Sequence, residues 1–585
     1  MVEKIERLRA LMRAKGWDAV VVTGSDPHAS EYPAERWKQV EWLSGFTGEA
    51  GDLVVTLDHA GLWTDTRYFI QAEQQLAGTG IVLHKTRVPE QVLIPEWLAQ
   101  QFGNDGLIAV DGLCVGADFA QSLPGTVISV PDLLGPFWAD RPDVPQTPVY
   151  TVDPGESRSE KFAWLRNFLR SADCDAILLT ALDEIAWTLN VRASDIEYNP
   201  LVISYLLLSQ EGEARWYVLK DRIEDPQTAA TLSILEADGV RALPYADIAY
   251  LPSELQGRLF VDAATLNYQL YSSLLSAGVA LEEGTSPVGL RKAVKNAREI
   301  EGMRRTHIQD GLAVERFLYW LERSLAAGRE ITEWDAAVRL GQLRAEQAGY
   351  RGDSFQTISA YGAGAALPHY ITPNTNAPVL RCEGLYLNDS GGQYDCGTTD
   401  ITRTVPLGPC SALEREDYTL VLKGHIDLAM AVFPEGTPGS RLDALAREPL
   451  WRSKRNFGHG TGHGVGWQLC VHEGPHELRQ NLNAVPLQPG MTLTDEPGIY
   501  REGKHGVRHE NLLLVVEAGA NEFGRWLAFE PLTLCHFETG ALERSLLDRS
   551  EIEWLNAYHE RVFRTLAPQL PPPIVDWLRE KTQPL

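Results

Sequence analysis

The first half of the chain repeats one pattern, and this repeat limits the possible folds more than any other feature of the sequence. Residues 6–23, ERLRALMRAKGWDAVVVT, place leucines at helical spacing before an Asp-Ala pair, a short apolar run and a Thr. Residues 160–180, EKFAWLRNFLRSADCDAILLT, do the same. Two further pairs of similar segments follow in the same order, at residues 41–46 and 186–191 and at residues 62–69 and 215–222. Three matches in one order predict two duplicated α/β domains.

Changes in composition indicate where the domains end. A chain of 585 residues is too long for one hydrophobic core. The Pro-rich segment at residues 142–157 is typical of a linker, and a second boundary is expected near residues 281–290, before a long helix from about Asn296 to Arg323. The two repeats are expected to be scaffolding or assembly domains without chemistry of their own. We therefore predict three domains, at residues 1–153, 154–287 and 288–585.

The overall composition excludes some classes of partner. The chain has 53 Lys and Arg against 79 Asp and Glu, and its net charge of -26 disfavours binding to nucleic acid or to an anionic membrane. No apolar run reaches the roughly 18 residues of a membrane span, and the charged amphipathic N-terminus does not resemble a signal peptide. The seven cysteines are scattered and odd in number. These features predict a cytoplasmic protein without a disulfide framework.

A histidine-rich stretch, HGTGHGVGWQLCVHEGPHE at residues 459–477, is the first candidate for chemistry. The H-E-x-x-H pattern within it, at residues 472–476, is a zinc signature only when a helix places its two histidines on one face. Its two middle residues are Gly and Pro, which break helices. We therefore expect His463 and His472 on extended or looped backbone, and any other metal ligands must come from elsewhere.

The first of two carboxylate-rich segments is YLNDSGGQYDCGTTDITRTV, residues 386–405. It predicts a strand, a glycine-containing turn and a second strand, a hairpin that would bring Asp389 and Asp400 side by side. Two adjacent carboxylates repel each other unless a cation lies between them. Asp395, by contrast, is better explained as an exposed turn residue.

The second segment is LTDEPGIYREGKHGVRHENLLLVVE, residues 493–517. It predicts two apolar strands around a glycine-rich loop, with Glu496 closing the first strand and Glu510 opening the second. A set of four carboxylates and one imidazole suits a pair of manganese, cobalt or zinc ions better than one structural zinc. The five candidate ligands are Asp389, Asp400, His463, Glu496 and Glu510.

Motifs in the last third resemble the pita-bread metallopeptidases and, within them, aminopeptidase P. The matching motifs cover most of residues 286–517 in the family's order and are SPVGLRKAVKNAREIEGMRRTHIQDG, ALPHY, DSGGQYDCGTTDITRTV, VLKGHI, HGTGHGVG, VHEGP, TDEPGIY and VRHENLLLVVE. The two repeats also resemble the N-terminal part of the long, three-domain, cytoplasmic type. The resemblance implies an α/β (α+β) chain in which two duplicated creatinase-like α/β domains precede a pita-bread catalytic domain.

The resemblance also implies roles for single residues. Carried over by motif, the metal ligands are the five residues found above, which would hold two divalent ions, with manganese expected and cobalt and zinc as alternatives. The implied substrate-binding residues are Phe355, His369, His459, His472 and Arg508. The implied catalytic residues are His369, His472 and Glu496. His509 departs from the family, which usually has an apolar residue there, and strand alternation predicts that it points away from the metals.

The implied activity is hydrolysis of the N-terminal Xaa-Pro bond of peptides by a hydroxide held between the two ions. Asp400 and Glu510 would bridge the ions, while His369 and His472 would stabilise the oxyanion and protonate the leaving nitrogen. Peptides with proline at the second position are the expected partners, and the family implies a homodimer. The nearest alternative is prolidase, which uses the same ligands on Xaa-Pro dipeptides but generally has one N-terminal domain. A non-catalytic pita-bread protein that only binds other proteins is the alternative from a different class.

Overall fold

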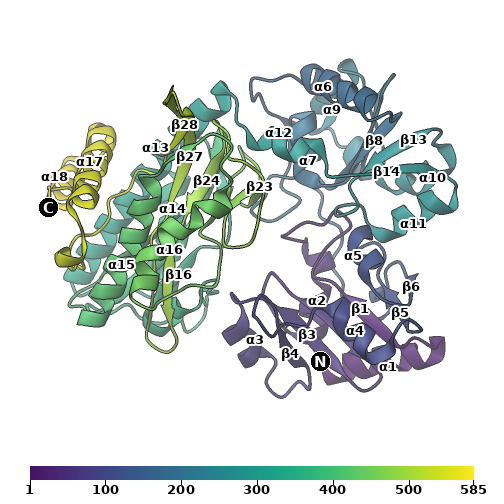
Figure 1. Ribbon diagram of the computed structural model, residues 1–585, viewed down its shortest axis with the longest axis horizontal. Coiled ribbons are helices and arrows are strands. Elements are labelled where there is room, and N and C mark those ends of the chain that lie inside the picture. The colour runs from purple at the N-terminus through teal and green to yellow at the C-terminus, as the bar shows by residue number, and fades with distance from the viewer. The chain divides into compact units, whose positions relative to one another are not determined.

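The computed structural model describes residues 1–585 and divides into two compact units, unit 1 (Met1–Val288) and unit 2 (Gly289–Leu585) (Figure 1). The division falls within the segment where the sequence predicts a boundary. Helix α12 (Pro287–Ala293) spans it, and helix α13 (Ala297–Ala326) follows with Asn296 as its N-cap. No helix combines the length and the apolar character that a membrane span requires.

Unit 1 contains two six-stranded sheets with the same strand order. In spatial order, the first sheet consists of β4 (Val82–Lys85), β3 (Ala60–Thr64), β2 (Asp52–Thr56), β1 (Ala19–Val22), β5 (Leu107–Val110) and β6 (Thr126–Ser129). The second consists of β12 (Val240–Pro244), β11 (Ala214–Val218), β10 (Ser204–Ser209), β8 (Ala176–Leu179), β13 (Arg258–Val261) and β14 (Ala280–Glu283). Strands β1 and β8 each have an antiparallel neighbour on one side and a parallel one on the other. The predicted duplication of an α/β fold is confirmed.

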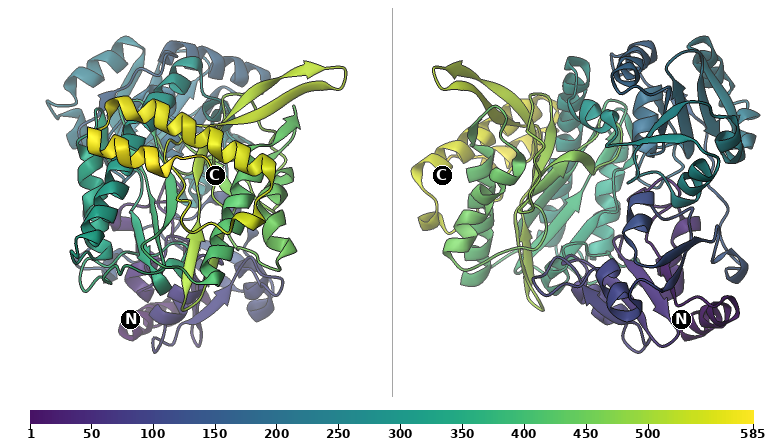
Figure 2. Two further views of the ribbon diagram at one scale, coloured as in Figure 1. Left: turned by 90° about the vertical axis from the view of Figure 1, so that its left-hand side faces the viewer. Right: turned by 45° about the vertical axis from the view of Figure 1, so that its right-hand side comes forward.

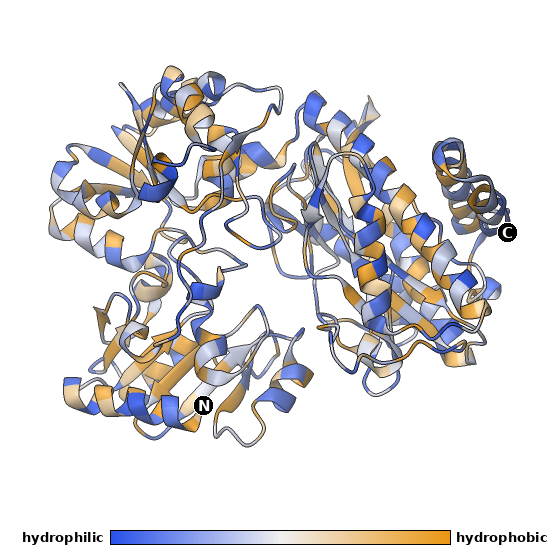
Figure 3. Cartoon of the chain, turned by 180° about the vertical axis from the view of Figure 1, so that it is seen from behind, coloured by the Kyte–Doolittle hydropathy of each residue, from blue (hydrophilic) through white to orange (hydrophobic).

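Helices begin and end in unit 1 where local signals place them. Helix α1 ends at Gly16, whose φ of 71° suits glycine, and α6 begins with a capping box between Ser157 and Glu160. The strands of the first sheet are largely apolar, whereas the helices carry polar and apolar residues on different faces (Figure 3). The helices of unit 1 are α1 (Val2–Lys15), α2 (Gln39–Ser44), α3 (Phe69–Gln75), α4 (Ile94–Phe102), α5 (Ala117–Ser122), α6 (Arg158–Ser171), α7 (Leu182–Leu189), α8 (Lys220–Ile223), α9 (Ala229–Ala237), α10 (Leu251–Glu254) and α11 (Tyr268–Ser276).

The predicted linker at residues 142–157 is mostly irregular. It contributes one short strand, β7 (Tyr150–Thr151), which pairs with β9 (Val191–Arg192). The two repeats also meet directly, since Gly116 of the first forms an antiparallel bridge with Asn267 of the second. These two residues occupy equivalent places after β5 and β13, so the repeats associate through corresponding segments.

Unit 2 is built around one larger and one smaller sheet. In spatial order, the larger sheet consists of β21 (Val432–Pro434), β28 (Gly524–Pro531), β27 (Asn511–Asn521), β24 (Thr492–Asp495), β22 (Gly462–Gly464) and β23 (Glu473–Leu478). The smaller consists of β16 (Ile358–Tyr361), β17 (Leu385–Ser390) and β20 (Ile401–Pro406). Strands β27 and β28 continue as a ribbon that projects from the rest of unit 2 (Figure 2).

Helices pack with these sheets and contribute to the core of unit 2. They are α13 (Ala297–Ala326), α14 (Glu333–Ala345), α15 (Ala412–Ala429), α16 (Asp443–Arg452), α17 (Arg549–Leu566) and α18 (Pro572–Lys581). Buried residues of one cluster come from α13, α15 and α17, for example Phe317, Tyr418 and Leu555. Figure 2 shows α17 and α18 lying side by side at the C-terminus.

The two carboxylate-rich segments contain more strands than the sequence predicts. Between Asp389 and Asp400 the chain forms β18 (Gly392–Tyr394) and β19 (Gly397–Thr398), which make a separate sheet with β15 (Tyr350–Asp353). The expected single turn there is therefore wrong, although β17 and β20 do pair. In the second segment the loop is itself a hairpin of β25 (Gly498–Arg501) and β26 (His505–Arg508). Polar strand residues that pair outside the main sheets give no apolar run, which is why the pattern hides them.

Candidate metal centre

The five candidate ligands lie on strands, or directly beside strand ends, in unit 2. Asp389 lies on β17 and pairs with Thr402 of β20, while Asp400 directly precedes β20. His463 is the middle residue of β22. The remaining two candidates flank paired strands, since Glu496 follows β24 and Glu510 precedes β27. Antiparallel pairing brings these ends together although they are far apart in the sequence.

His463 lies at the centre of this group. Its Nε2 is 3.5 Å from Asp400 Oδ2 and 3.7 Å from Glu496 Oε1. The ligand atoms of Asp400, His463 and Glu510 all lie within 4.8 Å of one another. His463 Nδ1 donates a hydrogen bond of 2.9 Å to the Gly464 carbonyl, which turns Nε2 toward the carboxylates. Metal-binding histidines commonly donate the second ring nitrogen in this way.

The carboxylates of this group are strongly perturbed. Burial, and then the charge of Asp389, raise the pKa of Asp400 to about 8. Burial raises the pKa of Glu496 to about 7, and burial together with Asp400 raises that of Glu510 well above its usual value. The Oδ1 atom of Asp389 is buried and has no hydrogen-bond partner. Divalent cations bound by these oxygens would compensate the negative charges and remove the repulsion between the carboxylates, so the donor set fits two such ions.

Arg508 contacts the candidate ligands directly. Its Nη2 is 2.5 Å from Asp389 Oδ2, and its Nε is 4.0 Å from Glu496 Oε2. Nε also donates to the hydroxyl of Thr402, which in turn donates to Glu510 Oε2 over 2.7 Å. The guanidinium therefore orients the carboxylates, a contact that adds to the substrate-binding role implied by sequence.

A hydrogen-bonded chain links Arg508 to His459. Arg508 Nη1 donates to the Tyr500 oxygen over 2.6 Å, and the Tyr500 hydroxyl lies 2.7 Å from His459 Nε2. His459 Nδ1 donates to the Gly460 carbonyl, so Nε2 accepts from Tyr500. Burial, and then the charge of Arg508, lower the pKa of His459 well below its usual value. This imidazole is therefore neutral. The sequence patterns did not single out Tyr500, although it is the last residue of the TDEPGIY motif and lies on β25.

The remaining predicted substrate residues are His472, His369 and Phe355. The ring of His472 meets that of His463 edge to face, with centroids 4.3 Å apart. His369 is half-buried and contributes to the lowered pKa of His459, which places the two imidazoles near each other. Phe355 is half-buried in the loop before β16, whose first residue, Ile358, pairs with Asp389.

The glycines of the HGTGHG motif allow close approach of strands. A Cβ on Gly462 would lie 1.8 Å from the Thr494 carbonyl oxygen, and one on Gly464 would lie 2.2 Å from that of Glu473. Only glycine therefore permits β22 to lie between β24 and β23. This packing places His463 beside Glu496, the residue that follows β24.

The H-E-x-x-H pattern does not form a metal site. Its residues 473–476 lie on strand β23, and its glutamate, Glu473, forms buried ion pairs with Lys292 and Lys295. The Nε2 atom of His476 donates to the Thr492 carbonyl over 2.8 Å. The expectation that no helix forms here is confirmed.

His509 lies between strands β26 and β27 rather than on a strand. Its ring is fully buried and packs edge to face against Tyr418, with a centroid distance of 4.4 Å, and against Phe537. That His509 points away from the metals stays a prediction, which these aromatic contacts support.

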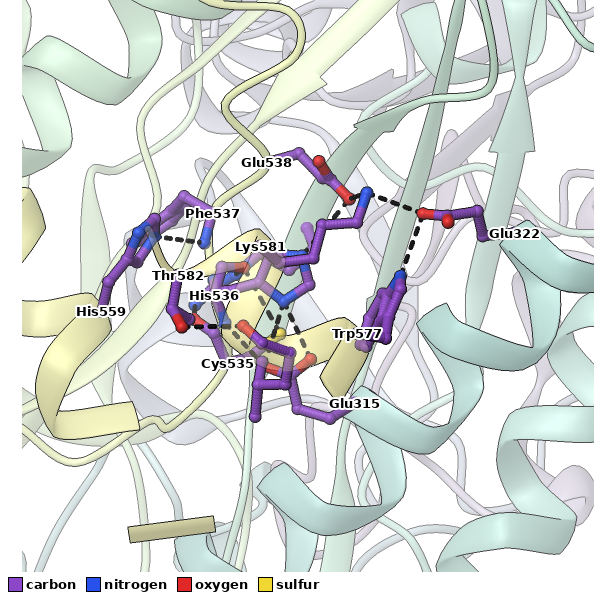
Figure 4. A network of polar contacts seen from close by, with 12 residues as sticks. Glu315, Glu322, Cys535, His536, Phe537, Glu538, His559, Trp577, Lys581 and Thr582 are labelled. Carbon is purple, nitrogen blue, oxygen red and sulfur yellow. Dashed lines mark hydrogen bonds and ion pairs between the residues drawn. The ribbon is translucent and has the colours of Figure 1, made fainter. Parts of the chain in front are cut away.

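A second group in unit 2, Glu315, Cys535 and His536, has ligand atoms close enough for a metal but is occupied by its own ion pairs (Figure 4). His536 Nδ1 donates to Glu315 Oε2 over 2.8 Å, and Nε2 donates to Glu538 Oε1 over 3.3 Å. Although burial lowers it, these carboxylates raise the pKa of His536 to about 9. Burial and Glu315 raise the pKa of the Cys535 thiol, which keeps it protonated. Lys581 Nζ completes the network, 2.6 Å from Glu538 and from Glu322.

Family models match the chain along its whole length. Residues 301–517 match the model described as metallopeptidase family M24, and residues 525–585 match the C-terminal region of that peptidase family. Residues 4–134 and residues 140–299 each match a creatinase/prolidase N-terminal domain. These matches to both repeats and to the last third of the chain agree with the resemblance to the pita-bread metallopeptidases found in the sequence.

Individual relatives give the same result. Aminopeptidase P1 of Arabidopsis thaliana is 37% identical, over 100% of this chain and 99% of its own. The X-prolyl aminopeptidase of Caenorhabditis elegans, described as a cytosolic enzyme with a di-nuclear active site, is 35% identical with a TM-score of 0.93, covering 100% of this chain and 99% of that one. An Xaa-Pro dipeptidase of Bacillus anthracis is 26% identical with a TM-score of 0.52, and the match covers 65% of this chain and 99% of that one. The full-length matches favour aminopeptidase P over prolidase, and the chain belongs to the aminopeptidase P family of the M24 metallopeptidases.

Proposed function

We propose that this chain releases the N-terminal residue from peptides that have proline at the second position, and that its carboxylate cluster holds two divalent ions for this reaction. The observation that carries the proposal is the convergence of ligand atoms of His463, Asp400 and Glu510, which all lie within 4.8 Å of one another. The proposed ligands are Asp389, Asp400, His463, Glu496 and Glu510. Manganese is the proposed metal, with cobalt and zinc as alternatives, because the donor set has four carboxylates and one imidazole.

Two divalent ions, when bound, supply Lewis acidity and a nucleophile at neutral pH. The chain's own residues orient the ligands and manage protons. Thr402 fixes one oxygen of Glu510 by a 2.7 Å hydrogen bond, and Arg508 holds Asp389. Glu496 is proposed to accept a proton from the attacking water, since its carboxylate is partly exposed and lies 3.7 Å from His463 Nε2.

The leaving nitrogen of an Xaa-Pro bond has no hydrogen and must gain a proton. We assign this step to His369 and His472, which also stabilise the oxyanion. The edge-to-face contact between His472 and His463 supports the assignment, because it places one imidazole beside the proposed ligands. His459 is proposed to bind substrate in its neutral form, and Phe355 and Arg508 to line the same site.

The test uses chelator-treated protein with an Xaa-Pro-Pro tripeptide and, separately, an Xaa-Pro dipeptide. Each is incubated with and without manganese, and the released residue is measured by chromatography. We expect metal-dependent release from the tripeptide, weaker release from the dipeptide, and loss of both in His463→Ala. Cleavage of the dipeptide alone would identify a prolidase. No cleavage with manganese, cobalt or zinc would leave a protein-binding role as the better explanation.

Three further properties belong to this proposal. We place the chain in the cytoplasm, as the Caenorhabditis elegans enzyme is described as cytosolic. We propose a homodimer, which light scattering after gel filtration would test by a mass twice that of one chain.

We also propose that residues 1–153, 154–287 and 288–585 fold as three domains, because each of the first two contains one complete sheet. Limited proteolysis should then cut near residues 142–157 and residues 281–290.

A further inference from the structure

Two of the proposed ligands have neighbours on the opposite face of the larger sheet. Asp495 precedes Glu496, Asn511 follows Glu510, and the two neighbours pair with each other between β24 and β27. Successive side chains of a strand point to opposite faces, so Asp495 and Asn511 face away from the ligands. Both are completely buried. Both residues contact His425 of helix α15. His425 belongs to the VLKGHI motif and has no part in the proposed chemistry.

His425 is held in one orientation by this pair. Its Nδ1 lies 3.0 Å from the Asp495 carbonyl oxygen and 3.1 Å from Asp495 Oδ2. Its Nε2 lies 3.2 Å from Asn511 Nδ2. An amide nitrogen can only donate and a carbonyl oxygen can only accept, so Nε2 accepts and Nδ1 donates. The ring, fully buried, also packs against Phe537 with a centroid distance of 5.2 Å.

The side chain of Asn511 continues the network toward the other ligand strand. Its Oδ1 accepts from Nη2 of Arg403 over 2.8 Å, so both ends of the amide are fixed. Arg403 Nη1 donates to the Glu510 carbonyl over 2.6 Å and to the Thr402 carbonyl over 3.0 Å. One connected set of hydrogen bonds therefore runs from helix α15 through Asn511 and Arg403 to the Glu510 carbonyl and to the strand that follows Asp400.

We propose that His425 is a positioning residue for the metal centre: it fixes Asp495 and Asn511 from behind and thereby sets the separation of Glu496 and Glu510. The inference rests on the proposed function, because it requires these two glutamates to be ligands. His425 touches neither substrate nor metal, and it acts through the backbone of Asp495 and the side chain of Asn511. Partners behind the ligands typically contribute about 10-fold to 100-fold to metal affinity.

The test compares three replacements of His425 in the full-length chain. His425→Leu removes both hydrogen bonds, His425→Asn retains a donor near the Nδ1 position, and His425→Gln retains a polar group near the Nε2 position. The matched control is His559→Leu, which removes a buried imidazole whose Nε2 accepts from the Phe537 backbone. Manganese binding to each apoprotein is measured by titration calorimetry, and thermal unfolding of each apoprotein is measured in parallel.

We expect His425→Leu to weaken manganese binding by about 10-fold to 100-fold, with smaller losses for the Asn and Gln variants. In the manganese-loaded forms, kcat should fall while KM for an Xaa-Pro-Pro peptide stays near that of the wild type. His559→Leu should lower the unfolding temperature without changing manganese affinity. If the His425 variants only lower the unfolding temperature, as the control does, the positioning role is wrong. If wild-type apoprotein binds no divalent ion, the ligand assignment itself fails, and this inference is rejected with it.

Discussion

Two buried groups of acids and histidines in unit 2 resemble each other in composition but differ in charge balance. In the candidate metal centre, four carboxylates face a single guanidinium, that of Arg508, and the imidazole of His463. In the second group, which we call the C-terminal ion-pair network, three carboxylates share two cations, His536 and Lys581 (Figure 4). The first group therefore needs added cations, whereas the second is nearly balanced by its own.

The two histidines show the same difference in their hydrogen bonds. His463 donates one ring nitrogen to a backbone carbonyl and turns the other toward carboxylates. His536 donates both ring nitrogens to carboxylates, which requires the charged imidazolium. Proximity of Glu, Cys and His side chains is thus not enough to define a metal site. The presence of protein cations and the direction of each imidazole decide which kind of site forms.

Replacing one glutamate by glutamine should abolish most of the activity in the first group but should lower stability in the second, and these are the largest effects we expect. Glu510→Gln removes a proposed ligand, so manganese-dependent cleavage of an Xaa-Pro-Pro peptide should fall by at least about 10³-fold. Glu315→Gln leaves His536 without its main partner, so unfolding should become easier by about 3 to 5 kcal/mol. Peptidase kinetics and urea unfolding of the apoproteins measure the two properties.

The proposed difference between the two groups is wrong if Glu315→Gln affects metal binding or if Glu510→Gln affects the stability of the apoprotein. Loss of manganese binding in folded Glu315→Gln would make the C-terminal ion-pair network a metal site. A large loss of apoprotein stability in Glu510→Gln would show that Glu510 is held by protein contacts alone. Kinetics should be normalised to the folded fraction, because Glu315→Gln reduces the amount of folded protein.

The pH dependence of stability should report the C-terminal ion-pair network. The pKa of His536 is raised from 6.5 to about 9, so its contribution is complete below about pH 6.5 and is lost as the pH rises through about 9. The loss amounts to about 3 kcal/mol. Although burial alone would raise it, His536 lowers the pKa of Glu538 to about 2, so that contribution is lost as the pH falls from about 4.5 toward 2.

Urea unfolding of the apoprotein between pH 6 and 10, roughly the range of the shift, measures the alkaline limb. His536→Gln is the control, and its stability should lack this loss between neutral pH and about pH 9. A wild-type curve parallel to that of His536→Gln would contradict a charged His536.

A smaller effect is expected where the network reaches the C-terminal helix. Lys581→Met removes the cation between Glu322 and Glu538, both 2.6 Å from its Nζ. About a quarter of the Lys581 side chain is exposed, so solvent screening limits the loss to about 1 kcal/mol. Hydrogen exchange should become faster in α18, while manganese affinity stays the same. Unchanged exchange in α18 would mean that Trp577 and the apolar contacts alone hold the helix.

Local patterns predicted much of this molecule, and long-range contacts account for what they missed. The repeat and the start of α13 at Asn296 follow from helical spacing, apolar runs and a capping box, which are properties of residues close together in the sequence. Four of the candidate ligands, the carboxylates, were selected because each follows or precedes an apolar run, and His463 was selected from the histidine-rich stretch. Tyr500 and Arg403 were not found, since each acts on residues brought near only by the fold.

The smallest effect should come from the third aspartate of the first carboxylate-rich segment. Asp395 lies between Asp389 and Asp400 in sequence, but it is about half exposed and pairs with Arg351 at the surface. Asp395→Asn should therefore change stability by no more than about 0.5 kcal/mol and leave manganese affinity unchanged. Calorimetric titration of this variant beside Asp389→Asn gives a matched pair of substitutions within one segment. Equal losses of affinity in both variants would mean that net negative charge, rather than the buried geometry around His463, attracts the ions.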